Sequence, residues 1–420
     1  YKLLSLSLAI ACLSGCSAAN TEIASSSAAT ATVTPTTDST EVPASNNVFT
    51  SAGDGLYVTT DSGIYELQTV FPDSANIFYT DANTKERIFL CANPNCTHAD
   101  ESCPSYIATP SAMFPPMLLR VGDQLLVVFT EATDSSNPHG MLMNMDGSNR
   151  RTVFELASNQ YMQGGFCTSG NDLYFDLYEI NDSGNVTYQL WYVSFENGTS
   201  EKVMDLGSDS DHYSLCDGAN NELCFNHVSS DGISYCMYNP QSKTISDPFF
   251  VDSSVSGNSM IQDGYLFVLD EQASSVQRIR LSDKEQASAS FTVKEGFGAP
   301  SMRYLFDGNL MITEAQTTAS DIPTDGSYGV CSYILDFGTR NCTEFTLQTP
   351  YNNRPVYVLT TIGDACYVAT DYKTYTPTSV SEDGTVSNFD YVANIYAFIT
   401  KQDYINSNQN GYSMVKDAFE

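Results

Sequence analysis

The sequence predicts an all-β protein, and more narrowly a β-propeller of four-stranded blades that follows a disordered N-terminal segment. The first observation is composition, because 26 Tyr and 22 Phe stand in a chain rich in Ser, Thr and Asn, which favours strands. The second is a repeated pattern in which a glycine turn precedes a short strand-like run. The third is that no long stretch shows a clear helical period.

The repeat predicts seven blades. Successive glycines are roughly 45 to 65 residues apart, which is close to the period of propeller blades. The glycines are Gly55, Gly122, Gly170, Gly218, Gly264, Gly308 and Gly363. We expect a strand near Val48 to open the first blade and residues 411–415 to close the last. A pair of β-sandwiches also spaces its strands regularly, but the even period along the whole chain favours the propeller.

The N-terminal residues are typical of a secretory signal, with an apolar run over residues 3–13 behind a lysine. Small residues lead from this run into Cys16, and the stretch resembles the lipobox of bacterial lipoproteins, whose cysteine carries a diacylglycerol. We therefore expect a signal peptide over residues 1–15 and a lipidated Cys16 at the start of the mature protein. The alternatives are an ordinary signal peptide with an incidental cysteine and a transmembrane helix. The helix is disfavoured because the apolar run is shorter than the about 20 residues that a membrane span needs.

Residues 16–47 start with Cys16 and consist mainly of Ser, Thr, Ala, Pro and Val, with three acidic residues as their only charges. Such a segment cannot bury enough apolar surface to offset its chain entropy. We expect a disordered tether here, followed by a single propeller domain over residues 48–420.

The charge balance excludes some classes of partner. The chain has 18 Lys and Arg against 50 Asp and Glu, which gives a net charge of −32. Nucleic acids and anionic lipid head groups are bound through clustered Lys and Arg, and no such cluster is present in the sequence. We expect no nucleic-acid partner, and contact with a membrane only through the lipid on Cys16.

The densest chemical feature is a group of three cysteines and one histidine after the last strand expected in the first unit. Its members are Cys91, Cys96, His98 and Cys103. A Cys₃His set can fill the tetrahedral coordination of a structural zinc ion. A loop with one disulfide and a spare thiol is the alternative, and it suits an exported protein. Both interpretations stay open from the sequence, and zinc is the only cofactor it suggests.

This stretch also carries a family resemblance. Leu90, Pro94 and the three cysteines with His98 match a pattern found in uncharacterised propeller lipoproteins of Gram-positive bacteria, which are related to TolB-like propellers. The resemblance extends to the lipobox, the tether and the repeated strands. It implies a propeller architecture and a location at the outer face of the bacterial membrane, but it implies no reaction.

No local sequence motif of a hydrolase or a nucleotide-binding site is present. The sequence therefore predicts a non-catalytic binding or scaffold propeller, anchored at the cell surface, whose partner is a glycan, a cell-wall polymer or a protein. The alternative is an extracytoplasmic carbohydrate-active enzyme, either a glycoside hydrolase or a lyase, because the abundant carboxylates could supply an acid and a base.

Overall fold

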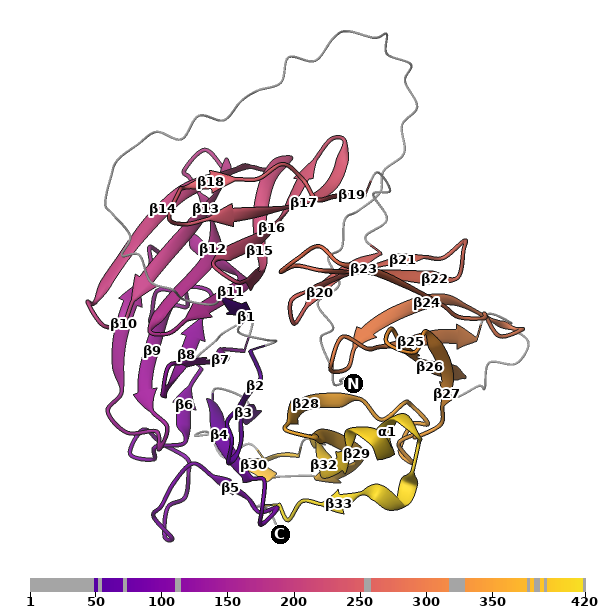
Figure 1. Cartoon of the computed structure of the whole chain (residues 1–420). Coiled ribbons are helices and arrows are strands. Elements are labelled where there is room, and N and C mark those ends of the chain that lie inside the picture. Colours follow the sequence, from indigo (N-terminus) through magenta and orange to yellow (C-terminus); the bar gives the residue numbers. More distant parts are fainter. Residues whose placement is uncertain are drawn as a thin grey trace, which may run out of the picture. The chain divides into compact units, whose positions relative to one another are not determined.

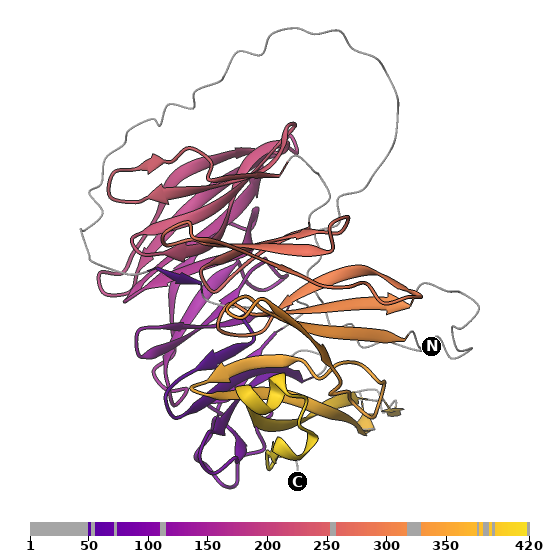
Figure 2. The same ribbon diagram turned by 45° about the vertical axis from the view of Figure 1, so that its right-hand side comes forward.

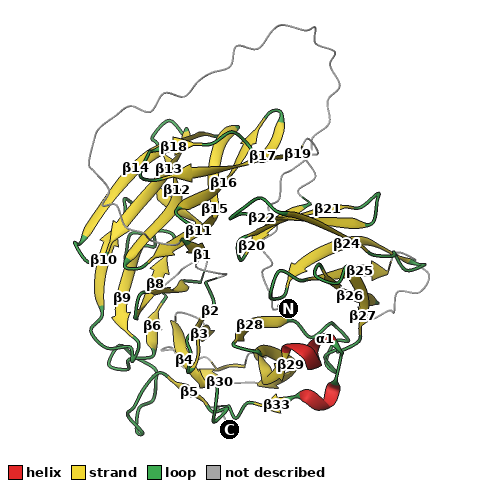
Figure 3. Cartoon of the chain, in the orientation of Figure 1, coloured by secondary structure: helices red, strands yellow, loops and turns green. Residues whose placement is uncertain are grey.

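The computed structural model describes residues 49–51, 55–70, 74–109, 115–252, 258–316, 329–375, 378–380, 386–388 and 391–417. Strands and turns make up nearly all of this part, and its helices are the short α1 (Lys401–Ile405) and η2 (Gln409–Gly411) near the C-terminus (Figures 1 and 3). Neither described helix has the length and apolar character that a membrane span needs. The predicted all-β class is confirmed.

The chain divides into two compact units. The larger unit takes its described residues from 42–372 and 394–420. The smaller unit takes them from 373–393 and includes the hairpin of β30 (Thr378–Val380) and β31 (Val386–Asn388). Apart from the ends of β29 and β32, the sheets described next belong to the larger unit.

Most of these sheets are antiparallel, and strands that are consecutive in the chain pair with each other (Figures 1 and 2). The first sheet contains β2 (Tyr57–Thr59), β3 (Gly63–Val70), β4 (Ser74–Asp81), β5 (Arg87–Phe89) and β6 (Tyr106–Ala108). The second contains β7 (Met117–Val121), β8 (Gln124–Phe129), β9 (His139–Asn144) and β10 (Arg151–Glu155).

A longer sheet follows. It contains β1 (Thr50–Ser51), β11 (Gln160–Ser169), β12 (Asp172–Ile180), β13 (Val186–Ser194), β14 (Thr199–Ser208), β15 (Asp211–Ala219), β16 (Glu222–Ser229), β17 (Gly232–Asn239), β18 (Thr244–Ile245) and β19 (Phe250–Asp252). The next two sheets contain β20 (Ser259–Gln262), β21 (Tyr265–Asp270), β22 (Ser275–Arg280) and β23 (Gln286–Ser290), then β24 (Phe297–Tyr304), β25 (Leu310–Gln316), β26 (Val330–Asp336) and β27 (Asn341–Phe345). The last contains β28 (Val358–Ile362), β29 (Ala365–Tyr375), β32 (Tyr391–Thr400) and β33 (Ser413–Met414).

This succession of mostly four-stranded antiparallel sheets is the predicted propeller fold. The count of seven blades stays a prediction, because β11 to β18 form one hydrogen-bonded sheet. The link within it is the hairpin between β14 and β15, where Gly207 pairs with His212 and Ser208 pairs with Asp211.

The glycine repeat marks the same place in most sheets. Gly122, Gly264, Gly308 and Gly363 lie in the turn between the first and second strands of a sheet, and Gly170 lies in the turn between β11 and β12 of the long sheet; all five have positive φ. In the fourth unit of the repeat, Gly218 lies at the end of β15 and Asn220 takes the positive φ in the turn. Gly55 differs, because it precedes β2, the first strand of its sheet.

The opening of the first sheet was predicted wrongly. The strand expected near Val48 is β1, and it pairs with β11 and not with the first sheet. The reason is the neighbouring Phe49, whose ring packs edge to face on Tyr174, 5.3 Å between centroids. Gly218 provides the space for Phe49, since a Cβ at Gly218 would lie 2.4 Å from the Phe49 Cβ.

Buried apolar side chains fill the space between consecutive sheets of the larger unit. Side chains of β2 to β4 pack with those of β7 to β9, and side chains of β21 to β23 pack with those of β25 and β26. The first and last sheets meet in the same way, because Ile64 of β3 packs with Tyr367 of β29 and Phe398 of β32. Each sheet thus depends on its neighbours to cover its faces.

A buried ion pair lies beside this last contact. Arg87 of β5 is 1% exposed and donates from Nη2 and Nε to one Glu66 carboxylate oxygen, at 2.8 and 3.0 Å. The Tyr396 hydroxyl of β32 donates to the other Glu66 oxygen at 2.5 Å. Arg87 also pairs with Asp417 at 3.1 Å, and its backbone N–H donates to the Lys416 carbonyl. The network therefore joins the first sheet to the last sheet and to the C-terminal residues.

Replacing Arg87 by Ala should destabilise the protein strongly, because the Glu66 carboxylate would stay buried without its countercharge. Removing one partner of a buried ion pair costs about 3–5 kcal/mol of unfolding free energy. Urea denaturation followed by tyrosine fluorescence measures this change.

The matched control is Arg120→Ala. Arg120 forms its ion pair with Asp123 at the surface, with side-chain exposures of 44% and 100%, so its loss should change stability by no more than about 0.5 kcal/mol. Equal urea midpoints for the two variants would contradict the role given to Arg87.

Candidate metal centre

The Cys/His group predicted from sequence lies on the loop that connects β5 to β6. Both strands pair along β4, so the two ends of the loop are brought together. Ile77 of β4 holds both ends through its backbone: its carbonyl accepts from the Leu90 N–H at 2.9 Å, and its N–H donates to the Ser105 carbonyl at 2.8 Å. Cys91 directly follows Leu90, and Cys103 stands two residues before Ser105. Both cysteines therefore lie close to Ile77 and to each other.

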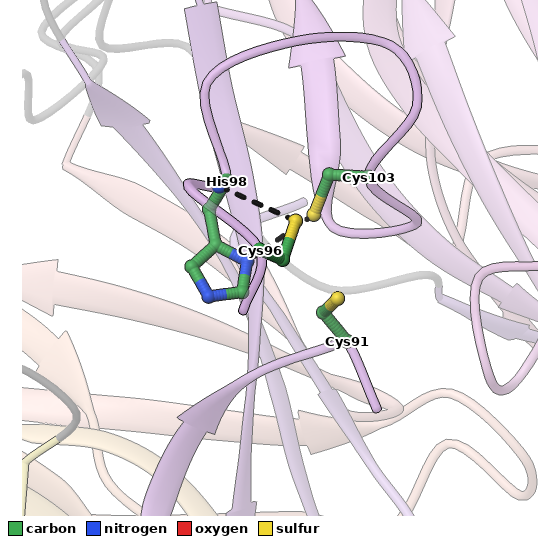
Figure 4. A group of neighbouring side chains, drawn as sticks. All are labelled: Cys91, Cys96, His98 and Cys103. Carbon is green, nitrogen blue, oxygen red and sulfur yellow. Dashed lines mark hydrogen bonds between the residues drawn. The ribbon is translucent and has the colours of Figure 1, made fainter. Parts of the chain in front are cut away.

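The four predicted ligand residues converge on one point (Figure 4). The sulfur atoms of Cys91, Cys96 and Cys103 and one imidazole nitrogen of His98 all lie within 4.8 Å of one another. The His98 Nδ1 is 3.3 Å from the Cys103 Sγ, and the His98 backbone N–H donates to the Cys96 Sγ at 3.4 Å. The structure thus brings together every residue that the sequence analysis assigned to this site.

Local backbone and ring packing fix the position of His98. Its φ of 55° is in the left-handed region, which turns the loop back toward Cys96. Its imidazole stacks on the ring of Phe89, the last residue of β5, with 4.0 Å between centroids and 9° between planes. The imidazole is therefore held by a strand residue and not only by the loop.

The surroundings favour the thiolate at Cys103, the most buried of the three sulfurs. Burial raises the pKa of Cys103, but hydrogen bonds from Ser105 and His98 outweigh it and lower the pKa to about 6. Burial raises the pKa of Cys91 to about 11. A thiolate is the form that ligates metals, so the lowered pKa makes Cys103 the best suited of the three cysteines to act as a ligand.

The donor set fits a zinc ion. Zinc–sulfur and zinc–nitrogen bonds of about 2.0–2.3 Å place the ligand atoms of a tetrahedron about 3.5–3.8 Å apart. The 3.3 Å separation of His98 Nδ1 and Cys103 Sγ is close to this, and the outer limit of 4.8 Å needs only a small contraction. The Cys103 sulfur is also 3.1 Å from the Ser105 hydroxyl, which donates to Asn76 of β4. Such outer contacts orient ligands in metal sites.

Other predicted features fall elsewhere. The signal peptide over residues 1–15, the lipidated Cys16 and the tether over residues 16–47 lie outside the described residues. Two further cysteine pairs lie on strands joined by a hairpin, Cys224 with Cys236 and Cys331 with Cys342. Neither pair is directly opposite in register, because Cys224 pairs with Met237 and Cys342 pairs with Leu335.

Sequence reasoning missed a buried carboxyl group, Asp176 in the middle of β12. It is 1% exposed; its Oδ2 accepts from the Leu215 N–H of β15 at 3.1 Å, and its Oδ1 has no hydrogen-bond partner. Burial raises its pKa to about 7, against an ordinary value of 3.8. The available signal was an acidic residue inside an otherwise apolar and aromatic run, residues 173–178.

Comparison with solved structures finds proteins of similar fold. They include puromycin hydrolase, 10% identical with a TM-score of 0.44 over 82% of this chain and 58% of that one. They also include TolB from Acinetobacter baumannii, 10% identical with a TM-score of 0.35 over 83% and 78%. A third is an oligogalacturonate lyase from Vibrio parahaemolyticus, 10% identical with a TM-score of 0.38 over 83% and 91%. No protein-family model and no curated protein matches the chain.

These matches bear on the predicted function. The names of the hydrolase and the lyase contradict the prediction of a non-catalytic binding or scaffold propeller, and they agree better with its alternative, a carbohydrate-active enzyme. The chain spans 35% to 59% of the length of several of the matched structures. At these identities the likeness concerns the fold, so the activities of those proteins are not transferred to this chain.

The raised pKa of Asp176 makes stability depend on pH. Because the pKa of the folded state, about 7, lies above the ordinary 3.8, the favourable contribution is complete below about pH 4 and is lost as the pH rises toward 7. The wild type should therefore lose urea resistance between pH 4 and pH 7, and Asp176→Asn should lose less over the same interval. Asp231→Asn, at an exposed turn, serves as the control. An Asp176→Asn variant that follows the wild-type slope would show that the pKa is not raised.

Proposed function

We propose that Cys91, Cys96, His98 and Cys103 hold one zinc ion and that this ion is structural. The observation that carries the proposal is the convergence of four donor atoms within 4.8 Å. Four protein ligands complete a tetrahedron and leave no open position for a substrate, as structural sites do. A zinc ion supplies here a fixed cross-link, which would hold the β5–β6 loop closed.

The hydrogen bonds around Cys103 support the metal over the disulfide alternative. A disulfide would use two of the three sulfurs and give His98 no role. The Ser105 backbone N–H and the His98 imidazole instead donate to the Cys103 sulfur and stabilise negative charge on it. A ligating thiolate carries that charge, and a disulfide sulfur does not.

We also propose the location that the sequence suggests. Cys16 would carry a lipid, and the protein would stand on the outer face of a bacterial membrane at the end of the 16–47 tether. The supporting observations are the apolar run and the small residues before Cys16, together with the resemblance to propeller lipoproteins of Gram-positive bacteria. The ligand in this setting would be a glycan, a cell-wall polymer or a protein.

Metal analysis tests the zinc site. Protein purified without chelator or reducing agent should contain about one zinc ion per chain. His98→Ala and Cys103→Ser should each lose most of it, since three ligands bind structural zinc far more weakly than four. Plasma mass spectrometry with a protein assay gives the ratio.

Cys342→Ser is the matched control, because Cys342 is an exposed thiol on β27 outside the site. It should keep the wild-type zinc content. Metal-free protein in which mass mapping links two of Cys91, Cys96 and Cys103 would refute the zinc site in favour of the disulfide.

The anchor is tested by fractionation. Cys16→Ala should leave the membrane fraction or accumulate as an unprocessed precursor, because the thioether forms only on the cysteine sulfur. Metabolic labelling with a tagged fatty acid should mark the wild type and not the variant. A Cys16→Ala protein that is cleaved normally and stays in the membrane would refute the anchor.

A further inference from the structure

A row of four rings crosses the long sheet at one end of its strands. It consists of Tyr161 of β11, Tyr178 of β12, Tyr188 of β13 and His212 of β15, and we name it the aromatic row. Tyr161 pairs in register with Tyr178, and Tyr178 with Tyr188. Neighbouring ring centroids are 5.1, 6.2 and 3.8 Å apart along the row.

Gly207 makes the last step of the row possible. It lies on β14 between Tyr188 and His212, and it pairs in register with both. Because glycine has no side chain, the Tyr188 and His212 rings meet across β14 and stack with 5° between their planes. A Cβ on Gly207 would approach the His212 Cα to 2.8 Å and would obstruct this contact.

The row lies at the edge of the core, because Tyr188 packs against the buried cluster that includes Tyr174 and Tyr192. All four of its side chains are half-buried. On the same two central strands, Tyr174 and Tyr192 are only 3% and 4% exposed and belong to a buried cluster. Tyr178 and Tyr188 are tilted by 51° at 6.2 Å, so neither ring fully covers a face of the other. The four rings are therefore partly accessible to solvent beside this buried cluster.

Polar groups border the row on the side of β11 and β15. Gln163 is exposed, bonds to the Tyr188 side chain, and accepts from the Ser214 hydroxyl at 3.3 Å. An amide and a hydroxyl beside half-exposed rings form a surface with both apolar and hydrogen-bonding character. This combination is typical of small-molecule sites, in which aromatic walls are joined by a few polar groups.

The chemistry of this surface matches a sugar. A pyranose has C–H groups on its faces, which are attracted to the negative face of an aromatic ring. Its hydroxyls at the edge can donate to and accept from amide and hydroxyl side chains. The local charge is negative, because Glu131 and Asp209 lie close enough to act electrostatically on Tyr178 and Tyr188. The charge would repel uronates and sugar phosphates.

We propose that the aromatic row, together with Gln163 and Ser214, binds an oligosaccharide of neutral or amino sugars. This inference rests on the first of the three ligand classes proposed above, a glycan, and it does not depend on the zinc site. The negative charge beside the aromatic row would select among glycans, and the residues of the row can be changed without altering the metal centre.

Binding to defined oligosaccharides tests the proposal. The probes are cellopentaose, maltopentaose, chitopentaose and its deacetylated form, and a galacturonate oligomer, titrated by calorimetry into the full mature chain. At least one neutral or amino-sugar probe should bind, and the galacturonate should not. Tyr178→Ala and Tyr188→Ala should raise the Kd for the bound probe by roughly tenfold or more, as loss of a central tyrosine does at binding sites.

Three variants separate a binding role from a structural one. Gln163→Ala, at an exposed position, should weaken binding with no change in melting temperature. Tyr178→Phe keeps the ring and should keep most of the affinity. Tyr351→Ala removes another exposed tyrosine, 56% exposed and distant in sequence, and should bind as the wild type does.

The outcomes are distinguishable. If no neutral or amino-sugar probe binds the wild type, both the glycan partner and the aromatic row are wrong. If a probe binds and the Tyr178, Tyr188 and Gln163 variants bind it equally well, the glycan partner stands and the aromatic row is wrong. Preference for galacturonate would overturn the charge argument, and zinc content should be the same in all variants.

Discussion

The ion pair of Arg87 with Glu66 is the contact that links the beginning of the larger unit to its end. Two charges removed from water lose more solvation energy than they regain from each other unless every remaining donor and acceptor is satisfied. Here Tyr396 satisfies the second Glu66 oxygen, and Gln68 and Asp417 accept from the remaining Arg87 groups. The pair is therefore stable only when the last sheet and the C-terminal residues are in place. The contact between the first and last sheets and the burial of the two charges therefore depend on each other.

The same short strand connects this junction to the candidate metal centre. β5 has three residues, which is too few to be stable by its own pairing with β4. Its first residue, Arg87, is held by the ion pair, and its last, Phe89, stacks on His98. Cys91 follows two residues later. A metal on the loop would thus restrain one end of β5 while the ion pair restrains the other. The buried ion pair and the proposed metal cross-link thus act on the two ends of one short strand.

The fold could be predicted because its turns are local. A glycine with positive φ before a strand is visible in the sequence, and five of the seven glycines mark equivalent turns. The grouping of Cys91, Cys96, His98 and Cys103 could be predicted because the four residues lie within one loop. The strand β1 was assigned to the wrong sheet because the neighbouring Phe49 packs on Tyr174, which is far away in the sequence. Asp176 and the aromatic row were missed for the same reason, since strand register brings Tyr161, Tyr178 and Tyr188 together and no sequence spacing reveals it.

Asp176 and the aromatic row are also physically connected. Asp176 and Tyr178 are two residues apart on β12, so their side chains leave the same face of the sheet. Asp176 holds β15 through the Leu215 N–H, and Leu215 follows Ser214, which bonds to Gln163 at the border of the row. The support beneath the row is therefore a carboxyl group with a pKa near 7. When it ionises, a charge without a full set of partners appears in the contact between β12 and β15.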